Sequence, residues 1–224
     1  MKLSTTDLGN GGTGMPKTIA PGNHKLKINS IVLEDFQFIQ DAKHLVLNVE
    51  TEPIADFEGF MIDKDDESKG HYAGQIGRVK ASQYAFADGE TKSGIKIQRD
   101  RSIMMFLKNL CQSLDLNDWF VAQDNMHDTI EDLVNEFNKT APYHDKFLSF
   151  CVAGKEYLNK AGYTNYDMYL PKAEKGKYAY GAEGKVVEYN EALHLKKVET
   201  TEVKDFGNEE LTIPAKTSSD FSLD

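Results

Sequence analysis

The chain has 224 residues, of which 40% are hydrophobic and 28% are charged, and its formal net charge is −10. This composition is ordinary for a globular protein in water, and no apolar run approaches the roughly 20 residues of a membrane-spanning helix. The first residues lack the apolar stretch of a signal peptide, so we expect a cytoplasmic protein with no membrane partner.

The charge is unevenly distributed along the chain. Residues 199–224 contain seven acids and two lysines, and this segment carries half of the net charge. Residues 69–108, in contrast, contain eight lysines and arginines. The local sign of charge decides what a surface attracts, so a net acidic chain can still bind a polyanion through this stretch.

Residues 1–20 are polar and rich in glycine and threonine, which predicts a loose arm. Gly9 and Gly14 have the glycine spacing of a phosphate-binding loop. Met15 and Pro16 stand where a lysine and a hydroxyl residue would have to reach the phosphates and magnesium, which excludes such a loop.

Three strands are predicted next, over residues 24–34, 43–50 and 70–86. The first two alternate apolar and polar residues, as half-buried strands do. In the third, alternation places Tyr72, Arg78 and Lys80 on one face, so these three are candidate contacts for nucleic acid. Glycines at 74 and 77 interrupt this strand, which indicates a bulge or a close approach of a ligand to the backbone.

Two helices are predicted within an insertion at about 99–140. Asp100 is the expected N-cap of the first, which runs to about Leu114. The cations Arg99 and Arg101 at its start are candidate phosphate contacts. The second helix, from 126 to 138, has an acidic outer face, which makes it a poor surface for DNA and a packing element instead.

Residues 146–189 begin with a strand at 147–153 and hold seven of the ten tyrosines, interleaved with lysines. Aromatic rings stack on bases and ammonium groups attract phosphates, a combination that suits single-stranded nucleic acid. Tyrosines are also good strand formers that half-bury on a sheet, so packing is the alternative explanation. Alternation over 163–170 places Tyr163 and Tyr169 on the face away from the core. The candidates from this stretch are Tyr163, Tyr169, Lys177, Tyr178 and Tyr180.

A last strand is expected at 192–198, with Leu193 and Leu195 inward. The order of elements predicts a mainly β protein with inserted helices: an OB-fold-like antiparallel barrel whose helices lie between the third and fourth strands. We expect a folded domain over 21–198, a flexible arm over 1–20, and an acidic, disordered tail over 199–224.

The chain resembles the single-stranded DNA-binding proteins of tailed bacteriophages. The similarity is carried by Pro21–Lys25, Ile62-Asp63, Ser68–Gly70, Gly74–Gly77 and Arg99-Asp100. The acidic C-terminus with an aromatic residue near its end is a second similarity. This resemblance implies an OB-fold that coats single strands during phage DNA replication and recombination, in the host cytoplasm, and a tail that docks partner proteins. Asp220, Phe221 and Asp224 match the tail pattern, and Leu223 is a further apolar anchor. We expect the tail to compete with DNA for the cationic surface until DNA displaces it.

Catalysis, cofactors and metals find little support in the sequence. The six histidines are scattered, and no zinc or nucleophile motif is present. The acidic run at 63–68 lacks the later glycine and glutamate of a calcium loop. Cys111 and Cys151 lie in apolar sequence, as buried thiols do. A different interpretation remains open, in which the chain is an acidic protein-interaction module, such as a phage adaptor or a DNA mimic. The sequence leaves the oligomeric state open.

Overall fold

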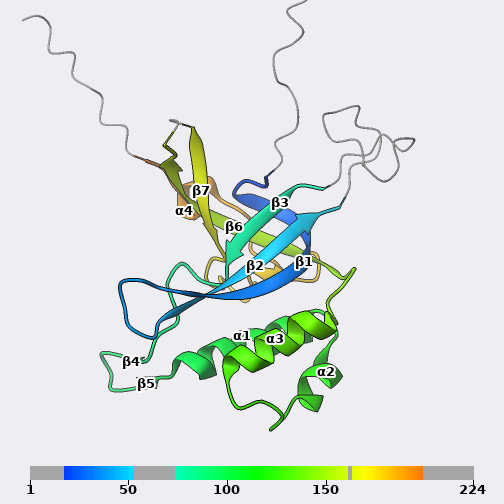
Figure 1. Ribbon diagram of the computed structural model, residues 1–224. Helices are drawn as coiled ribbons and strands as arrows, with labels where there is room; N and C mark the ends of the chain where they lie inside the picture. Colours follow the sequence, from blue (N-terminus) through cyan, green and yellow to red (C-terminus); the bar gives the residue numbers. More distant parts are fainter. Residues whose placement is uncertain (1–17, 53–73, 161–162, 199–224) are drawn as a thin grey trace, which may run out of the picture.

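The computed structural model describes residues 18–52, 74–160 and 163–198, and these residues form a mainly β structure with few helices (Figure 1). The large mixed sheet has seven strands: β1 Gly22–Asp35, β2 Lys43–Thr51, β3 Ile76–Lys80, β6 Phe147–Leu158, β7 Thr164–Tyr169, β8 Tyr180–Gly181 and β9 Leu195–Lys196. A separate hairpin consists of β4 Gly89–Glu90 and β5 Lys96–Ile97. The helices are α1 Arg99–Ser113, α2 Asn117–Ala122, α3 Ile130–Thr140 and α4 Glu191–His194.

Hydrogen bonds run in a closed ring through five of the strands, in the order β1, β2, β3, β7, β6 and back to β1. Helices α1–α3 follow β3 and precede β6, so they stand between the third and fourth ring strands, as the sequence predicts. The expectation of a wholly antiparallel sheet is wrong, because β3 pairs with β7 and β6 with β9 in parallel. Between β3 and β7 the chain forms the helices and β6. Such a long connection allows β7 to pair with β3 in parallel, which a short hairpin turn does not.

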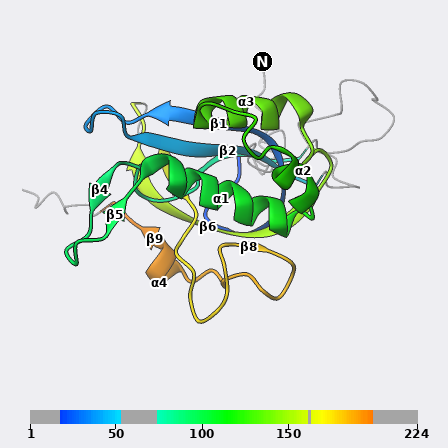
Figure 2. The same ribbon diagram turned by 90° about the horizontal axis from the view of Figure 1, so that it is seen from below.

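Alternation along β1 and β2 builds the core, as the sequence predicts. Leu26 and Ile28 of β1 and Leu45, Leu47 and Val49 of β2 are all buried. They belong to one cluster with the apolar stripes of α1 and α3, which lie across β1, β2 and β6 in the view from below (Figures 1 and 2). The opposite faces of β2 and β3 carry the polar side chains of Asn48, Arg78 and Lys80 together with the apolar side chains of Val46 and Ile76.

The start of α1 differs from the prediction. The N-cap is Gln98, not Asp100, and the cap makes no side-chain hydrogen bond with the helix. Instead, the Arg99 amide donates to the carboxylate of Asp88, 2.7 Å away, so an acid outside the helix satisfies one of its free amides. The second predicted helix is α3, which starts at Ile130 rather than at 126 because Thr129 caps it by accepting from the Asp132 amide at 3.1 Å.

The third strand is also shorter than predicted, since β3 ends at Lys80 and the chain bends before Phe86 bridges to Lys43. At Gly77 the close neighbour is neither a bulge nor a ligand but a side chain of the protein itself, because a Cβ there would lie 2.5 Å from the Ile19 side chain. Ile19 is buried and its amide donates to the Ile76 carbonyl at 3.0 Å. Residues 18–20 are therefore part of the fold and not of the N-terminal arm.

The strand predicted at 192–198 is wrong for most of its length, because α4 occupies its first part. The Asn190 side chain caps this short helix by accepting from the Ala192 amide at 3.0 Å. Leu193, expected inward, is exposed, while His194 is buried. Among the residues that the structure describes, no helix has both the length and the apolar character needed to cross a membrane.

Candidate nucleic-acid interface

A groove of about 930 Å³ lies over the outer faces of β2, β3, β6 and β7; we call it the sheet-face groove. Its polar lining includes Asn48 of β2, Arg78 and Lys80 of β3, Lys155 and Tyr157 of β6, and Asp167 of β7. Asn48 lies opposite Arg78 in the β2–β3 register, and Lys155 lies opposite Asp167 in the β6–β7 register. Cross-strand neighbours of this kind share a face, so the members of each pair lie side by side on the same face of the sheet.

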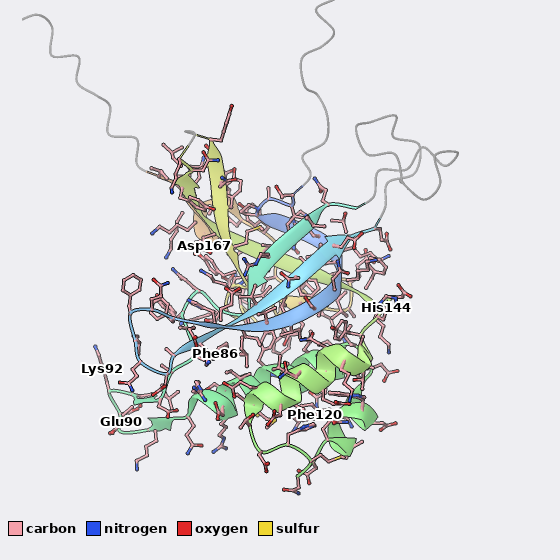
Figure 3. All side chains as sticks on the ribbon, in the orientation of Figure 1. Phe86, Glu90, Lys92, Phe120, His144 and Asp167 are labelled. Carbon is pink, nitrogen blue, oxygen red and sulfur yellow. The ribbon has the colours of Figure 1, made fainter. Side chains whose placement is uncertain are left out.

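Carboxylates neutralise part of the positive charge in this groove. The Lys80 ammonium lies 2.8 Å from the Asp167 carboxylate, and the Arg78 guanidinium is paired with Glu34. Asp167, labelled in Figure 3, stands between Lys80 and the exposed Lys155 of the neighbouring strand. Three cations and two acids therefore line the groove. The ion pairs of Arg78 with Glu34 and of Lys80 with Asp167 would have to break before these two cations could bind a phosphate.

Aromatic side chains stand at the hairpin that joins β6 and β7. Tyr163 is 71% exposed and Tyr157, which lines the groove, is 46% exposed. The Tyr163 amide donates to the Asn159 side chain at 2.9 Å, and the Asn159 amide donates to the Tyr163 carbonyl at 2.9 Å, which closes the hairpin. The Tyr157 ring therefore shares the groove with three cations, and the Tyr163 ring stands on the adjoining hairpin. Exposed rings can stack on bases and cations can attract phosphates, so this arrangement has the chemistry that single-stranded nucleic acid requires.

Two of the predicted stacking tyrosines are not available for stacking. Tyr169 does lie on the outer face, beside Lys80 in the register, but it is only 7% exposed, and burial raises its pKa. Tyr180 is half-buried, with its ring 5.6 Å from Phe106 and 5.8 Å from Phe150, and burial raises its pKa as well. Both rings pack within the protein, so the packing explanation holds for them.

Four further predicted residues lie outside the sheet-face groove. Arg99 binds the Asp41 carbonyl at 2.8 Å and the Asp100 carboxylate at 2.6 Å, a hydrogen bond that raises its pKa, so it ties the start of α1 to the β1–β2 turn. Arg101 is exposed on α1. Lys177 pairs with Glu188 at 2.9 Å, and Tyr178 beside it is 64% exposed. Of the described candidates, the groove therefore brings together Arg78 and Lys80, with Tyr163 on the adjoining hairpin.

Lys155 and Tyr157 belong to the groove and were not among the sequence candidates. The sequence pattern could have identified them. Side chains alternate along a strand, so residues 155 and 157 share the face opposite to that of the buried Val152. At the other end of β2, the ring of His44 lies 5.1 Å from that of Phe36 in an edge contact. Burial lowers the pKa of His44, and the nearby Lys80 ammonium lowers it further.

The remaining predictions concern thiols, metals and segments outside the described residues. Cys111 and Cys151 are buried and free, and burial raises their thiol pKa values to about 12 and about 11. Within the described ranges, no group of three or more histidine, cysteine or acidic side chains is placed to hold a metal. Tyr72, the acidic run at 63–68, and the tail residues Asp220, Phe221, Leu223 and Asp224 lie outside the described residues.

Comparisons of the chain with protein-family models, with curated proteins and with solved structures found no match. What the sheet-face groove can bind therefore has to be judged from its own chemistry.

Proposed function

We propose that the sheet-face groove binds single-stranded DNA without sequence preference, and that the protein is a non-enzymatic binder in phage DNA replication and recombination. The observation that carries this proposal is the joint placement of Arg78, Lys80, Lys155 and the exposed ring of Tyr157 in one groove, next to the β6–β7 hairpin that bears the exposed Tyr163. Cationic grooves track the phosphate backbone, and aromatic rings accept any base, which makes such binding tolerant of sequence.

The strand order supports the finer proposal that the ring is an OB-fold. An OB-fold is a five-stranded, partly open barrel whose second and third strands and flanking loops bind oligonucleotides. In this chain the ring also has five strands, and the groove covers its second and third strands, β2 and β3, and the hairpin of its last two, β6 and β7. The resemblance to phage single-stranded DNA-binding proteins points to the same fold.

The experiment is a titration of a fluorescein-labelled oligo-dT, followed by anisotropy, with the protein and a pair of lysine variants. Lys80→Ala with Lys155→Ala should weaken binding and reduce the salt slope by about 0.7 for each phosphate of the single strand that is no longer neutralised. The matched control is Lys92→Ala with Lys139→Ala, two exposed lysines outside the groove, which should leave the slope nearly unchanged. Equal slopes in both double variants would count against this groove as the binding site.

The tyrosines test the stacking part of the proposal. Tyr157→Ala or Tyr163→Ala should each cost about 1–3 kcal/mol of binding free energy with little dependence on sequence. Tyr178→Ala provides the matched control, because Tyr178 is about as exposed as Tyr163 but lies neither in the groove nor on the β6–β7 hairpin beside it. A larger loss for Tyr178→Ala would move the binding site to the segment around β8.

The proposal includes the acidic tail as a competitor of DNA and as a docking segment for replication or recombination proteins. A tethered polyanion has a high effective concentration near its own cationic groove. Truncation after about residue 206 should therefore raise the affinity for oligo-dT, most clearly at low salt where screening is weak. Unchanged or weaker binding by a folded truncated protein would remove the tail from the proposal but not the groove.

A second candidate function is an acidic protein-interaction module without DNA binding. The observation in its favour is that Arg78 and Lys80 are each already paired with a carboxylate. Such a module would leave oligo-dT free at low salt and would bind a basic protein instead, so the same titration separates the two functions.

A further inference from the structure

A second hollow, of about 620 Å³, lies among the helices; we call it the helical groove. One wall is a stripe of α1 with a residue at every fourth position, Asp100, Met104, Lys108 and Gln112. The opposite wall comes from α2, the turn that follows it and the first turns of α3. The α1 stripe runs from Asp100 to Gln112, a rise of about 18 Å at 1.5 Å per residue, which matches about three turns of another helix.

The helical groove presents apolar side chains to solvent. Met104 is 41% exposed and Val121 is 61% exposed, and both line the hollow. Its base includes the buried side chains of Ile130 and Leu133 and the half-buried ring of Phe120, labelled in Figure 3. Isolated exposed apolar residues are common, but Met104 and Val121 come from two helices and meet the buried apolar residues of α3 in one concave site, which is typical of an interaction surface.

The rim and the surroundings of the helical groove are acidic. Asp124 and Asp128 stand on the rim, and residues 115–136 contain seven acids and no lysine or arginine. A nucleic-acid backbone would be repelled here. The same repulsion disfavours the chain's own tail, which is acidic, and a symmetric dimer through this face, which would bring two acidic rims together.

We propose that the helical groove docks an amphipathic helix with a basic face, supplied by another protein. An amphipathic helix places apolar anchors at i, i+3 or i+4, and i+7 into such a groove, and its basic residues would meet Asp124 and Asp128. Methionine suits this use because its flexible side chain adapts to different partners. The site is on the helical side, apart from the sheet-face groove, so partner docking and DNA binding are separate functions of one molecule (Figure 1).

The test uses the full chain and a fluorescein-labelled 18-residue peptide of leucine and lysine, with leucines at helical spacing. Two control peptides are used. The first has the same residues in scrambled order, and the second keeps the order but has glutamate in place of each lysine. Saturable binding of the amphipathic basic peptide, with weaker binding of both controls, is expected. Binding of the scrambled peptide with equal affinity, or no saturable binding of the basic peptide, would overturn the proposal.

Two double variants then locate the site. Met104→Gln with Val121→Ser removes apolar contacts and should weaken peptide binding about tenfold, a loss typical of an interface anchor. Asp124→Asn with Asp128→Asn should weaken it about two- to fivefold at low salt and less at high salt.

The matched controls are Ile95→Ser, at an equally exposed apolar residue outside the groove, and Asp145→Asn with Glu183→Gln; they should leave peptide binding unchanged. Circular dichroism checks that each variant is folded, and oligo-dT affinity should not change in any of them. Wild-type peptide affinity in both groove variants would overturn the proposal. So would a change of oligomeric state in Met104→Gln with Val121→Ser, which would assign the groove to a second copy of the chain.

Discussion

Replacing Asp167 by asparagine should strengthen the binding of single-stranded DNA. The Asp167 carboxylate lies 2.8 Å from the Lys80 ammonium and beside Lys155 in the β6–β7 register. Asparagine has nearly the same shape, so the groove keeps its form and loses one negative charge. Both lysines can then interact with phosphate without a competing carboxylate.

The size of the effect follows from the exposure of the pair. The side chains of Lys80 and Asp167 are 25% and 49% exposed, so water and salt screen their attraction. Pairs at such positions contribute about 0.2–1 kcal/mol, and releasing the lysine should tighten DNA binding by up to about fivefold. The salt slope should become steeper by about 0.7, because one more net charge releases counterions from the single strand.

The assay is oligo-dT anisotropy at several salt concentrations, with Asp145→Asn as the control, since Asp145 is exposed and lies outside the sheet-face groove. The control should change neither affinity nor slope by a comparable amount. If Asp167→Asn bound DNA with the same or lower affinity while remaining folded, the idea that this carboxylate competes with phosphate would be refuted.

Three predictions concern stability and reactivity. Asn138→Ala should lower the free energy of unfolding, measured by urea denaturation, by about 2–4 kcal/mol. The reason is that the Asn138 side chain joins α3 to β1, accepting from the Ile31 amide at 2.9 Å and donating to the Ile31 carbonyl at 2.7 Å. A loss below about 0.5 kcal/mol would contradict this role. The lowered pKa of His44 means that its contribution to stability is present above pH 6.5 and is lost as the pH falls through the folded-state pKa, so wild type should lose more stability than His44→Gln on acidification, and parallel curves would refute this. Cys111 and Cys151, with raised pKa values, should react with iodoacetamide at neutral pH only after unfolding, and labelling of the native protein would show that they are accessible.

The sequence was a good guide wherever a long, regular pattern decided the structure. The alternation over 24–34 and 43–50 gave β1 and β2 to within two residues, and helical spacing gave the end of α1. Short elements could not be predicted in this way, because a four-residue helix such as α4 is too short to show a helical period in the sequence. The parallel pairing of β3 and β7 also escaped, since it depends on how the chain returns after the helices.

The candidate site was predictable only in part, and the tyrosines show why. Alternation correctly placed Tyr169 on the outer face, but it could not reveal that other parts of the chain cover this ring. It also could not reveal the ion pairs, because Glu34 lies 44 residues from Arg78 and Asp167 lies 87 residues from Lys80 in the sequence. Contacts between residues so far apart depend on the folded topology and have no local signal.

The measurement that tests the central proposal most directly is the titration of labelled oligo-dT with the wild-type protein at low salt and at physiological salt. Single-strand binding predicts saturable binding at low salt and a linear fall of log K with log salt concentration. A protein that leaves oligo-dT unbound at low salt, and binds a basic protein under the same conditions, would contradict this function and favour the acidic interaction module.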